Sequence, residues 1–135
     1  MCISRKSDKI RARIFQEAPK ADCAVLPEVF SRIYKELPDS KLLLVGDGEL
    51  AEDIKQQVES KGLRDVVIFT GNVDNVQDYY QAMDCFLLPS LYEGLGIVAV
   101  EAQAAGLACV LSTGVPEDAV IGSNVCRLDL SDPQA

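Results

Sequence analysis

Histidine is absent from the 135-residue sequence, which excludes imidazole acid–base catalysis and metal sites built on histidine. No apolar run approaches the roughly twenty residues that a membrane-spanning helix needs. The basic N-terminus is not followed by an apolar stretch, so we do not expect a secretory signal peptide. The sequence also contains no internal repeat and no low-complexity tract.

The five cysteines are widely spaced and form no CxxC pair. Cys85 and Cys109 fall inside apolar, strand-like runs, where cysteine behaves as a small buried hydrophobe. We therefore expect buried free thiols, with no disulfide and no metal site, and a reducing cytoplasmic location.

The formal net charge of −8 argues against nucleic acid as a partner, because phosphate backbones are bound by basic surfaces. The charge is unevenly distributed along the chain. Residues 1–20 carry six basic and two acidic side chains, whereas the rest of the chain carries seven basic and nineteen acidic ones. The basic segment is compatible with an anionic ligand or membrane lipid, and equally with a solvated leader.

Apolar patterns predict helices that alternate with short strands, in a single domain over residues 21–135. We expect helices over 25–37, 49–61, 76–83 and 97–105, and strands over 41–45, 66–69, 85–88, 108–111 and 124–128. Residues 1–20 are poorly patterned, apart from a weak alternation over 10–15 that favours an edge strand. Alternating elements with short loops predict an α/β fold with a doubly wound parallel sheet.

Three glycine-containing loops directly follow predicted strands: Gly46–Gly48, Gly71–Asn72 and Gly94–Gly96. In a parallel sheet they would share the carboxyl edge, where ligands of such folds bind. The third loop leads into a predicted helix, whose free N–H groups and dipole form an anion site.

Two carboxylates flank this third loop, Glu93 before it and Glu101 in the second turn of the helix. Glu101 lies among apolar residues, so we expect it to face the crevice, where a ribose diol is a suitable partner. Glu93 could accept hydrogen bonds from sugar hydroxyls. The spacing of the two glutamates fits a second interpretation equally well, in which Glu93 is a solvated loop residue and Glu101 an exposed helical residue.

Five segments, in order and at suitable spacing, resemble the donor-binding domain of family 4 glycosyltransferases. They are LLLVGDGEL (42–50), VIFTG (67–71), QAMD (81–84), PSLYEG (89–94) and EAQAAG (101–106). The similarity runs from about Val25 to Leu130 and is greatest to bacterial capsular and exopolysaccharide transferases. It implies a three-layer Rossmann-like domain, one half of a GT-B fold, and retaining transfer from a UDP- or GDP-sugar without a cofactor or an obligatory metal.

The resemblance also implies roles for individual residues. Glu93 would contact the donor sugar at the catalytic centre, and Glu101 the ribose. The N–H groups of the turn at Gly94, Leu95, Gly96 and Ile97 would approach the sugar and diphosphate. The other two loops, with Gly46 and Gly48 and with Gly71 and Asn72, would border the nucleotide. The sequence departs from the family pattern at two places. Arg13, the candidate for the diphosphate-binding arginine, is not preceded by the usual Gly, and Leu95 replaces an aromatic residue. Lys20 is the candidate for the accompanying lysine.

By this resemblance we expect the chain to be a fragment, truncated at its C-terminus and inactive alone, of a longer enzyme. A missing N-terminal domain would bind a polysaccharide or lipid-linked acceptor, in the cytoplasm or in peripheral contact with the inner face of the membrane. Two alternatives remain, a sugar-nucleotide epimerase of the same architecture and a non-catalytic nucleotide-binding or scaffold domain.

Overall fold

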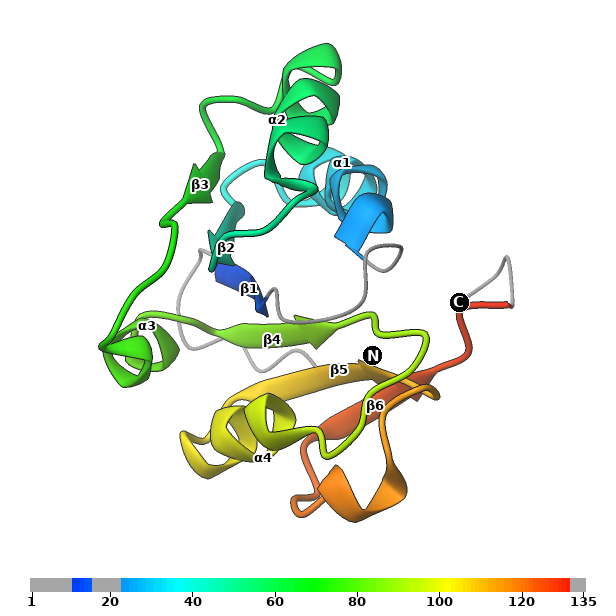
Figure 1. Ribbon diagram of the computed structural model, residues 1–135. Helices are drawn as coiled ribbons and strands as arrows, with labels where there is room; N and C mark the ends of the chain where they lie inside the picture. Colours follow the sequence, from blue (N-terminus) through cyan, green and yellow to red (C-terminus); the bar gives the residue numbers. More distant parts are fainter. Residues whose placement is uncertain (1–10, 16–22, 132–135) are drawn as a thin grey trace.

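The computed structural model describes residues 11–15 and 23–131, which alternate between strands and helices (Figure 1). The strands are β1 (Arg11–Phe15), β2 (Lys41–Val45), β3 (Val67–Phe69), β4 (Cys85–Leu88), β5 (Ala108–Ser112) and β6 (Val125–Leu128). The helices are α1 (Leu26–Glu36), α2 (Ala51–Ser60), α3 (Val76–Gln81) and α4 (Ile97–Ala104), with short 3-10 turns η1 (Cys23–Val25) and η2 (Glu117–Ala119). The helices and strands predicted between residues 25 and 128 are confirmed, with small differences at their ends.

The six strands form one parallel sheet in the order β3-β2-β1-β4-β5-β6. The chain builds outward from β1 to β3 on one side and from β4 to β6 on the other. The predicted α/β fold with a doubly wound parallel sheet is therefore confirmed. Its switch point lies between β1 and β4, and folds of this type bind ligands there, at the carboxyl ends of the strands.

Strand β1 lies inside the sheet, so the sequence-based expectation of an edge strand at this position is wrong. Its residues pair in parallel with β2 along the whole strand and with β4 at Ala12 and Arg13. The expectation came from the alternation of arginine and apolar residues within β1, a pattern typical of strands with one solvated face. The pairing shows that residues 11–15 belong to the sheet although they fall within the basic N-terminal segment.

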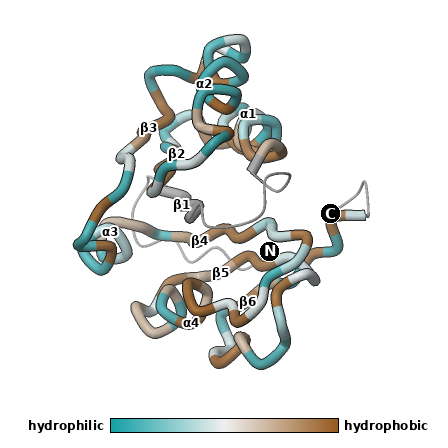
Figure 2. The backbone as a smooth tube through the Cα atoms, viewed as in Figure 1, coloured by the Kyte–Doolittle hydropathy of each residue, from teal (hydrophilic) through white to brown (hydrophobic). Residues whose placement is uncertain are grey.

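Two apolar clusters hold helices against opposite faces of the sheet, which gives the three layers visible in Figure 1. One cluster joins α1 and α2 to β2, with Phe30, Leu42 and Ile54 almost completely buried. The other joins α3 and α4 to β4 and β5, with Phe86 and Leu111 at its centre. The apolar colouring of β4 and β5 in Figure 2 follows from this arrangement, because strands covered on both faces need apolar side chains on both.

Gly96 sets the entry into α4. It precedes Ile97 with φ +66°, a left-handed conformation that glycine adopts without steric cost. A Cβ at this position would also lie 2.8 Å from the Cβ of Ala119. The turn that was predicted between β4 and the helix is thus confirmed, and it brings η2 against the start of α4.

None of the helices in the described part of the chain has the length and apolar character that crossing a bilayer requires.

Candidate functional site

The three predicted glycine loops lie at the carboxyl edge of the sheet, as the parallel strands require. The loop after β2 and the loop after β3 are joined directly, because Gly46 donates its N–H to the carbonyl of Gly71 over 2.9 Å. Gly48 donates its N–H to the side chain of Asp47 over 2.8 Å. The third loop, residues 89–96, follows β4 on the other side of the switch point.

Glu93 is held by its side chain and by its backbone. The hydroxyl of Ser90, which is fully buried, donates to Oε2 of Glu93 over 3.2 Å. The backbone N–H of Glu93 donates to the carbonyl of Gly114 over 3.0 Å. Ser112 in turn donates a short hydrogen bond to the carbonyl of Ser90. The carboxylate is half-buried, so the site presents it at a defined position while leaving it accessible to a ligand.

Glu101 is half-buried in the second turn of α4, and its carboxylate accepts a hydrogen bond from a residue of another helix. The donor is the hydroxyl of Tyr80 in α3, 3.1 Å from Oε2. Sequence reasoning placed Glu101 near the crevice but missed Tyr80, because no motif marks this tyrosine within the helix predicted over 76–83.

The start of α4 has backbone donors that make no hydrogen bond within the helix. The first helical hydrogen bonds are donated by Ala99 and Val100 to the carbonyl of Gly96, over 3.0 and 3.2 Å. The N–H groups of the preceding residues, Gly96 and Ile97 among them, therefore lie ahead of the helical ladder, where they are suited to an anion. Leu95 beside them is 77% exposed.

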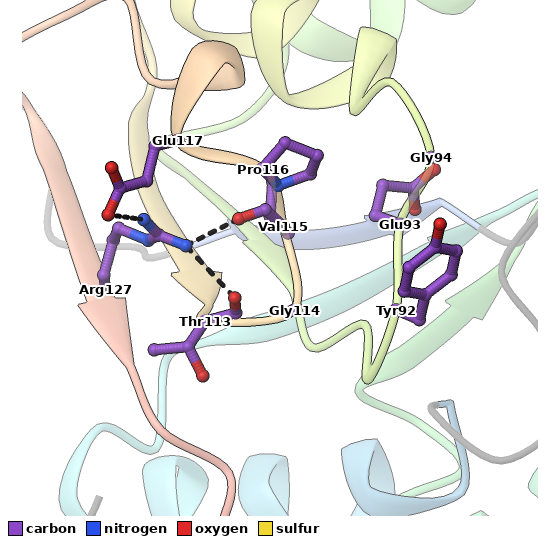
Figure 3. A pocket seen from close by; sticks show the side chains of 9 residues that line it. All are labelled: Tyr92, Glu93, Gly94, Thr113, Gly114, Val115, Pro116, Glu117 and Arg127. Carbon is purple, nitrogen blue, oxygen red and sulfur yellow. Dashed lines mark hydrogen bonds and ion pairs between the residues drawn. The ribbon is translucent and has the colours of Figure 1, made fainter.

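An open pocket of about 520 Å³ adjoins Glu93 (Figure 3). It is lined by the turn after β4, the loop after β5 and a side chain of β6: Tyr92, Glu93, Gly94, Thr113, Gly114, Val115, Pro116, Glu117, Arg127. No sequence motif pointed to Arg127.

Arg127 fastens the loop that forms one wall of this pocket. Its Nη2 donates to the carbonyl of Val115 over 2.5 Å and to that of Thr113 over 3.2 Å. Its Nη1 lies 3.5 Å from Oε1 of Glu117, whose side chain is otherwise exposed. Figure 3 shows the guanidinium reaching across from β6 to these three residues. The rigid fork of arginine thus holds two carbonyls and a carboxylate at once.

The predicted basic partners of the diphosphate remain predictions. Lys20 lies outside the residues that the structure describes. Arg13 lies in β1, next to the switch point, but its side chain is outside the description as well.

The two buried thiols are structural. Burial raises the pKa of Cys85 to about 11, with a smaller contribution from the nearby carboxylate of Asp84. Burial likewise raises the pKa of Cys109 to about 12. Both thiols stay protonated near neutral pH, so neither acts as a nucleophile there. Within the described ranges, no group of three His, Cys, Asp or Glu residues could hold a metal ion.

A doubly wound parallel sheet, with glycine loops and two carboxylates after its strands, is the architecture of Rossmann-like domains. The chain belongs to the family described as "Glycosyl transferases group 1", which matches residues 12–135. The predicted relationship to glycosyltransferases is therefore confirmed.

Relatives and solved structures agree with this assignment. The chain is 42% identical over 95 residues to the putative glycosyltransferase EpsF of Bacillus subtilis, covering 69% of this chain and 24% of that protein. It is 38% identical over 77 residues to an Escherichia coli UDP-Gal:alpha-D-GlcNAc-diphosphoundecaprenol alpha-1,3-galactosyltransferase, covering 56% of this chain and 20% of that protein. A crystal structure of an S. aureus TarM mutant, in complex with Fondaparinux, alpha-GlcNAc-glycerol and UDP, has a TM-score of 0.76. Its sequence identity is 22%, and the match covers 82% of this chain and 23% of that chain.

The chain therefore spans about a quarter or less of the length of these proteins. The likeness to TarM establishes the fold, which is one half of the GT-B architecture expected from the sequence.

Proposed function

We propose that this chain is the donor-binding part of a retaining glycosyltransferase that uses a UDP- or GDP-sugar. One observation carries the proposal: Glu93 and Glu101 flank the N-terminus of α4 at the carboxyl edge of the sheet, beside its switch point. A nucleotide sugar combines a diphosphate with two sets of hydroxyls. Backbone N–H donors suit the diphosphate, and carboxylates suit the hydroxyls.

In the proposed mode of binding, Glu101 accepts hydrogen bonds from the ribose diol and Glu93 from hydroxyls of the donor sugar. The N–H groups of Leu95, Gly96 and Ile97 approach the diphosphate. The loops at Gly46–Gly48 and Gly71–Asn72 border the nucleotide. Lys20 and Arg13 are the proposed cations opposite the helix.

Charge stabilisation supplies the proposed chemistry. As the bond between the sugar and the diphosphate breaks, negative charge accumulates on the leaving diphosphate. Donors already fixed at the start of α4 stabilise that charge without having to reorganise, which lowers the barrier. We propose that transfer needs no cofactor and no obligatory metal.

The acceptor belongs to the rest of the enzyme in this proposal. The named E. coli relative acts on a diphosphoundecaprenol-linked sugar, and the TarM complex contains UDP. We infer that the whole protein extends a polysaccharide or a lipid-linked acceptor in the cytoplasm, with peripheral contact to the membrane. The 135-residue chain alone should bind nucleotide without transferring sugar.

Isothermal titration calorimetry with UDP, GDP and ADP tests the donor site. We expect one nucleoside diphosphate to bind best, and Glu101→Ala to weaken that binding by roughly 10-fold or more, since a hydrogen bond to a charged group contributes about 1.5–3 kcal/mol. Glu36→Ala is the matched control, because Glu36 is an exposed carboxylate at the end of α1 and the helix ends at the opposite edge of the sheet.

Indifference of the wild-type chain to all three nucleotides would contradict the proposal. It would favour the alternative of a scaffold domain that keeps the fold without the ligand.

A further inference from the structure

Tyr80 brings a hydroxyl group to one of the two proposed binding carboxylates from a different helix. Its Oη lies 3.1 Å from Oε2 of Glu101 and 3.4 Å from the carbonyl oxygen of Val98. A phenol has one hydrogen to donate. The carboxylate is the nearer acceptor and the charged one, and hydrogen bonds to charged acceptors are the stronger kind.

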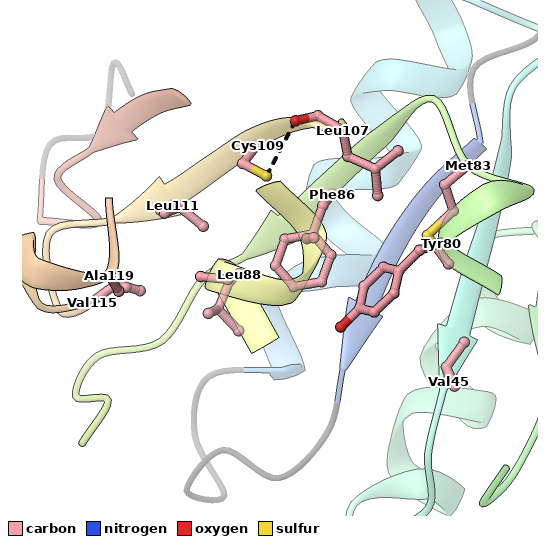
Figure 4. Packing of buried hydrophobic residues seen from close by; sticks show 12 residues of the cluster. Val45, Tyr80, Met83, Phe86, Leu88, Leu107, Cys109, Leu111, Val115 and Ala119 are labelled. Atoms are coloured by element: carbon pink, nitrogen blue, oxygen red, sulfur yellow. Dashed lines mark hydrogen bonds between the residues drawn. The ribbon is translucent and has the colours of Figure 1, made fainter. Parts of the chain in front are cut away.

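The ring that carries this hydroxyl is fixed by packing. Tyr80 is 2% exposed, and it lies edge-on against Phe86 with ring centroids 6.2 Å apart and an interplanar angle of 62°. Figure 4 shows the two rings side by side in the apolar cluster between the sheet and the helices. The ring, and with it the hydroxyl, is therefore fixed by α3, which carries Tyr80, and by its packing against Phe86 of β4.

Glu101, by contrast, has a flexible side chain at a half-buried position. Three rotatable bonds separate its carboxylate from the helix, and fixing such a side chain on binding costs conformational entropy. A carboxylate that is already held in place avoids part of that cost. One bond to Oε2 still leaves Oε1 and the second lone pair of Oε2 available for ligand hydroxyls.

We propose that Tyr80 is a positioning residue, which holds the carboxylate of Glu101 in the orientation that accepts both hydroxyls of a ribose. This inference rests on the proposed function, because it assumes that Glu101 contacts the ribose. It adds that the ribose specificity of the site depends on a buried residue that no ligand touches.

The test compares nucleotides with and without the diol. UDP, GDP and their 2′,3′-dideoxy counterparts are titrated by calorimetry into the wild-type chain, Tyr80→Phe and Glu101→Gln. Tyr80→Phe keeps the ring and its packing and removes only the hydroxyl. The matched control is Tyr79→Phe, because Tyr79 is the adjacent tyrosine of α3 and only partly buried.

We expect the wild-type chain to prefer the ribose form of its nucleotide. Tyr80→Phe should lose about 3- to 10-fold in affinity for the ribose form and little for the dideoxy form, as expected for one net hydrogen bond. It should have no further effect when combined with Glu101→Gln. Tyr79→Phe should leave both affinities unchanged.

Three kinds of result would overturn the inference, and each has a different meaning. If Tyr80→Phe keeps the full preference for the ribose form while Glu101→Gln loses it, the donor site stands and the positioning role fails. If Tyr80→Phe lowers the affinity for the ribose and dideoxy forms equally, the hydroxyl has only a structural role. If the wild-type chain binds neither form, or Glu101→Gln changes nothing, the proposed role of Glu101 fails together with this inference.

Discussion

Glu93 donates its backbone N–H to the carbonyl of Gly114 over 3.0 Å, which joins the turn after β4 to the loop after β5. The two loops touch so closely that a Cβ on Gly114 would lie 2.3 Å from the carbonyl oxygens of both Ser90 and Leu91. Real Cβ atoms do not approach backbone oxygens to this distance. Gly114 is therefore required for the position of Glu93, although it lies 21 residues away in the sequence.

Gly114→Ala should displace the turn that carries Glu93. Backbone atoms must move to admit the methyl group, so we expect a loss of about 2–4 kcal/mol in the free energy of unfolding, at or above the usual cost of overpacking. Urea unfolding followed by circular dichroism measures this loss. Gly122→Ala is the control, because its Cβ would meet only Gln103 Oε1, at 3.6 Å. Equal stabilities of the two variants would contradict the packing described for Gly114.

The sequence predicted those parts of the fold that depend on local patterns. The apolar runs of β2 and β4 and the glycines that follow them were sufficient to place the loops on one sheet edge. Glu93 and Glu101 were found because they flank a recognisable turn. Strand β1 was taken for an edge strand, because parallel pairing with β2 and β4 leaves no strong local pattern in a strand of five residues.

The contacts that hold the site were not predictable in the same way. Tyr80 lies 21 residues from Glu101, and Arg127 lies 12 residues from Val115. Both interactions depend on how α3 and β6 pack against neighbouring elements. A tyrosine in a short helix and an arginine in a short strand are common features, so neither residue type identifies its partner from sequence alone.

Arg127→Lys should loosen the wall of the pocket. A lysine ammonium lacks the planar fork that reaches the carbonyls of Thr113 and Val115 and the carboxylate of Glu117. We expect the free energy of unfolding to fall by about 1–2 kcal/mol, which is typical of one or two net hydrogen bonds. Hydrogen exchange measured by mass spectrometry should become faster in the peptide over residues 113–117.

The control for this prediction is Arg64→Lys. The Arg64 side chain is 79% exposed and pairs only loosely with Glu59, at 3.5 Å. We expect no measurable change in the free energy of unfolding of Arg64→Lys, because exposed ion pairs contribute little to stability. Unchanged exchange over 113–117 in Arg127→Lys would show that the guanidinium does not hold the loop.

Gln103→Glu should destabilise the link between α4 and the segment around η2. The amide nitrogen of Gln103 donates to the carbonyls of Ala99 and Ala119 over 2.9 and 2.7 Å, and its oxygen accepts from the N–H groups of Ile121 and Gly122, both over 2.9 Å. A carboxylate of the same shape keeps the acceptor but places negative oxygen against two carbonyls. We expect the free energy of unfolding, measured with urea at pH 7, to fall by about 1–3 kcal/mol.

Gln56→Glu serves as the comparison, since Gln56 is exposed in the middle of α2. A surface change of this kind should stay within about 0.5 kcal/mol. If Gln103→Glu is tolerated as well as Gln56→Glu, the four hydrogen bonds of Gln103 do not contribute to stability as the geometry indicates.

The buried thiols predict how stability changes at alkaline pH. Burial raises the pKa of Cys85 to about 11 and that of Cys109 to about 12, from an ordinary value of 9.0. Above pH 9 the unfolded chain releases these protons while the folded chain retains them. Because the folded state then binds more protons, the free energy of unfolding falls as pH rises. The stabilisation is complete below pH 9 and is lost progressively as pH rises, up to about pH 11 for Cys85 and about pH 12 for Cys109.

Urea unfolding at pH 8, 9, 10 and 10.5 measures this slope. Cys85→Ala and Cys109→Ala should each make the decline with pH shallower than in wild type, even though each variant starts from a lower stability because of the small cavity. Cys126→Ala is the control, because this cysteine is free and exposed. Tyrosine and lysine titrations contribute equally to all of these variants and cancel in the comparison. An unchanged slope in both buried-site variants would mean that the two thiols ionise in the folded chain as readily as in the unfolded one.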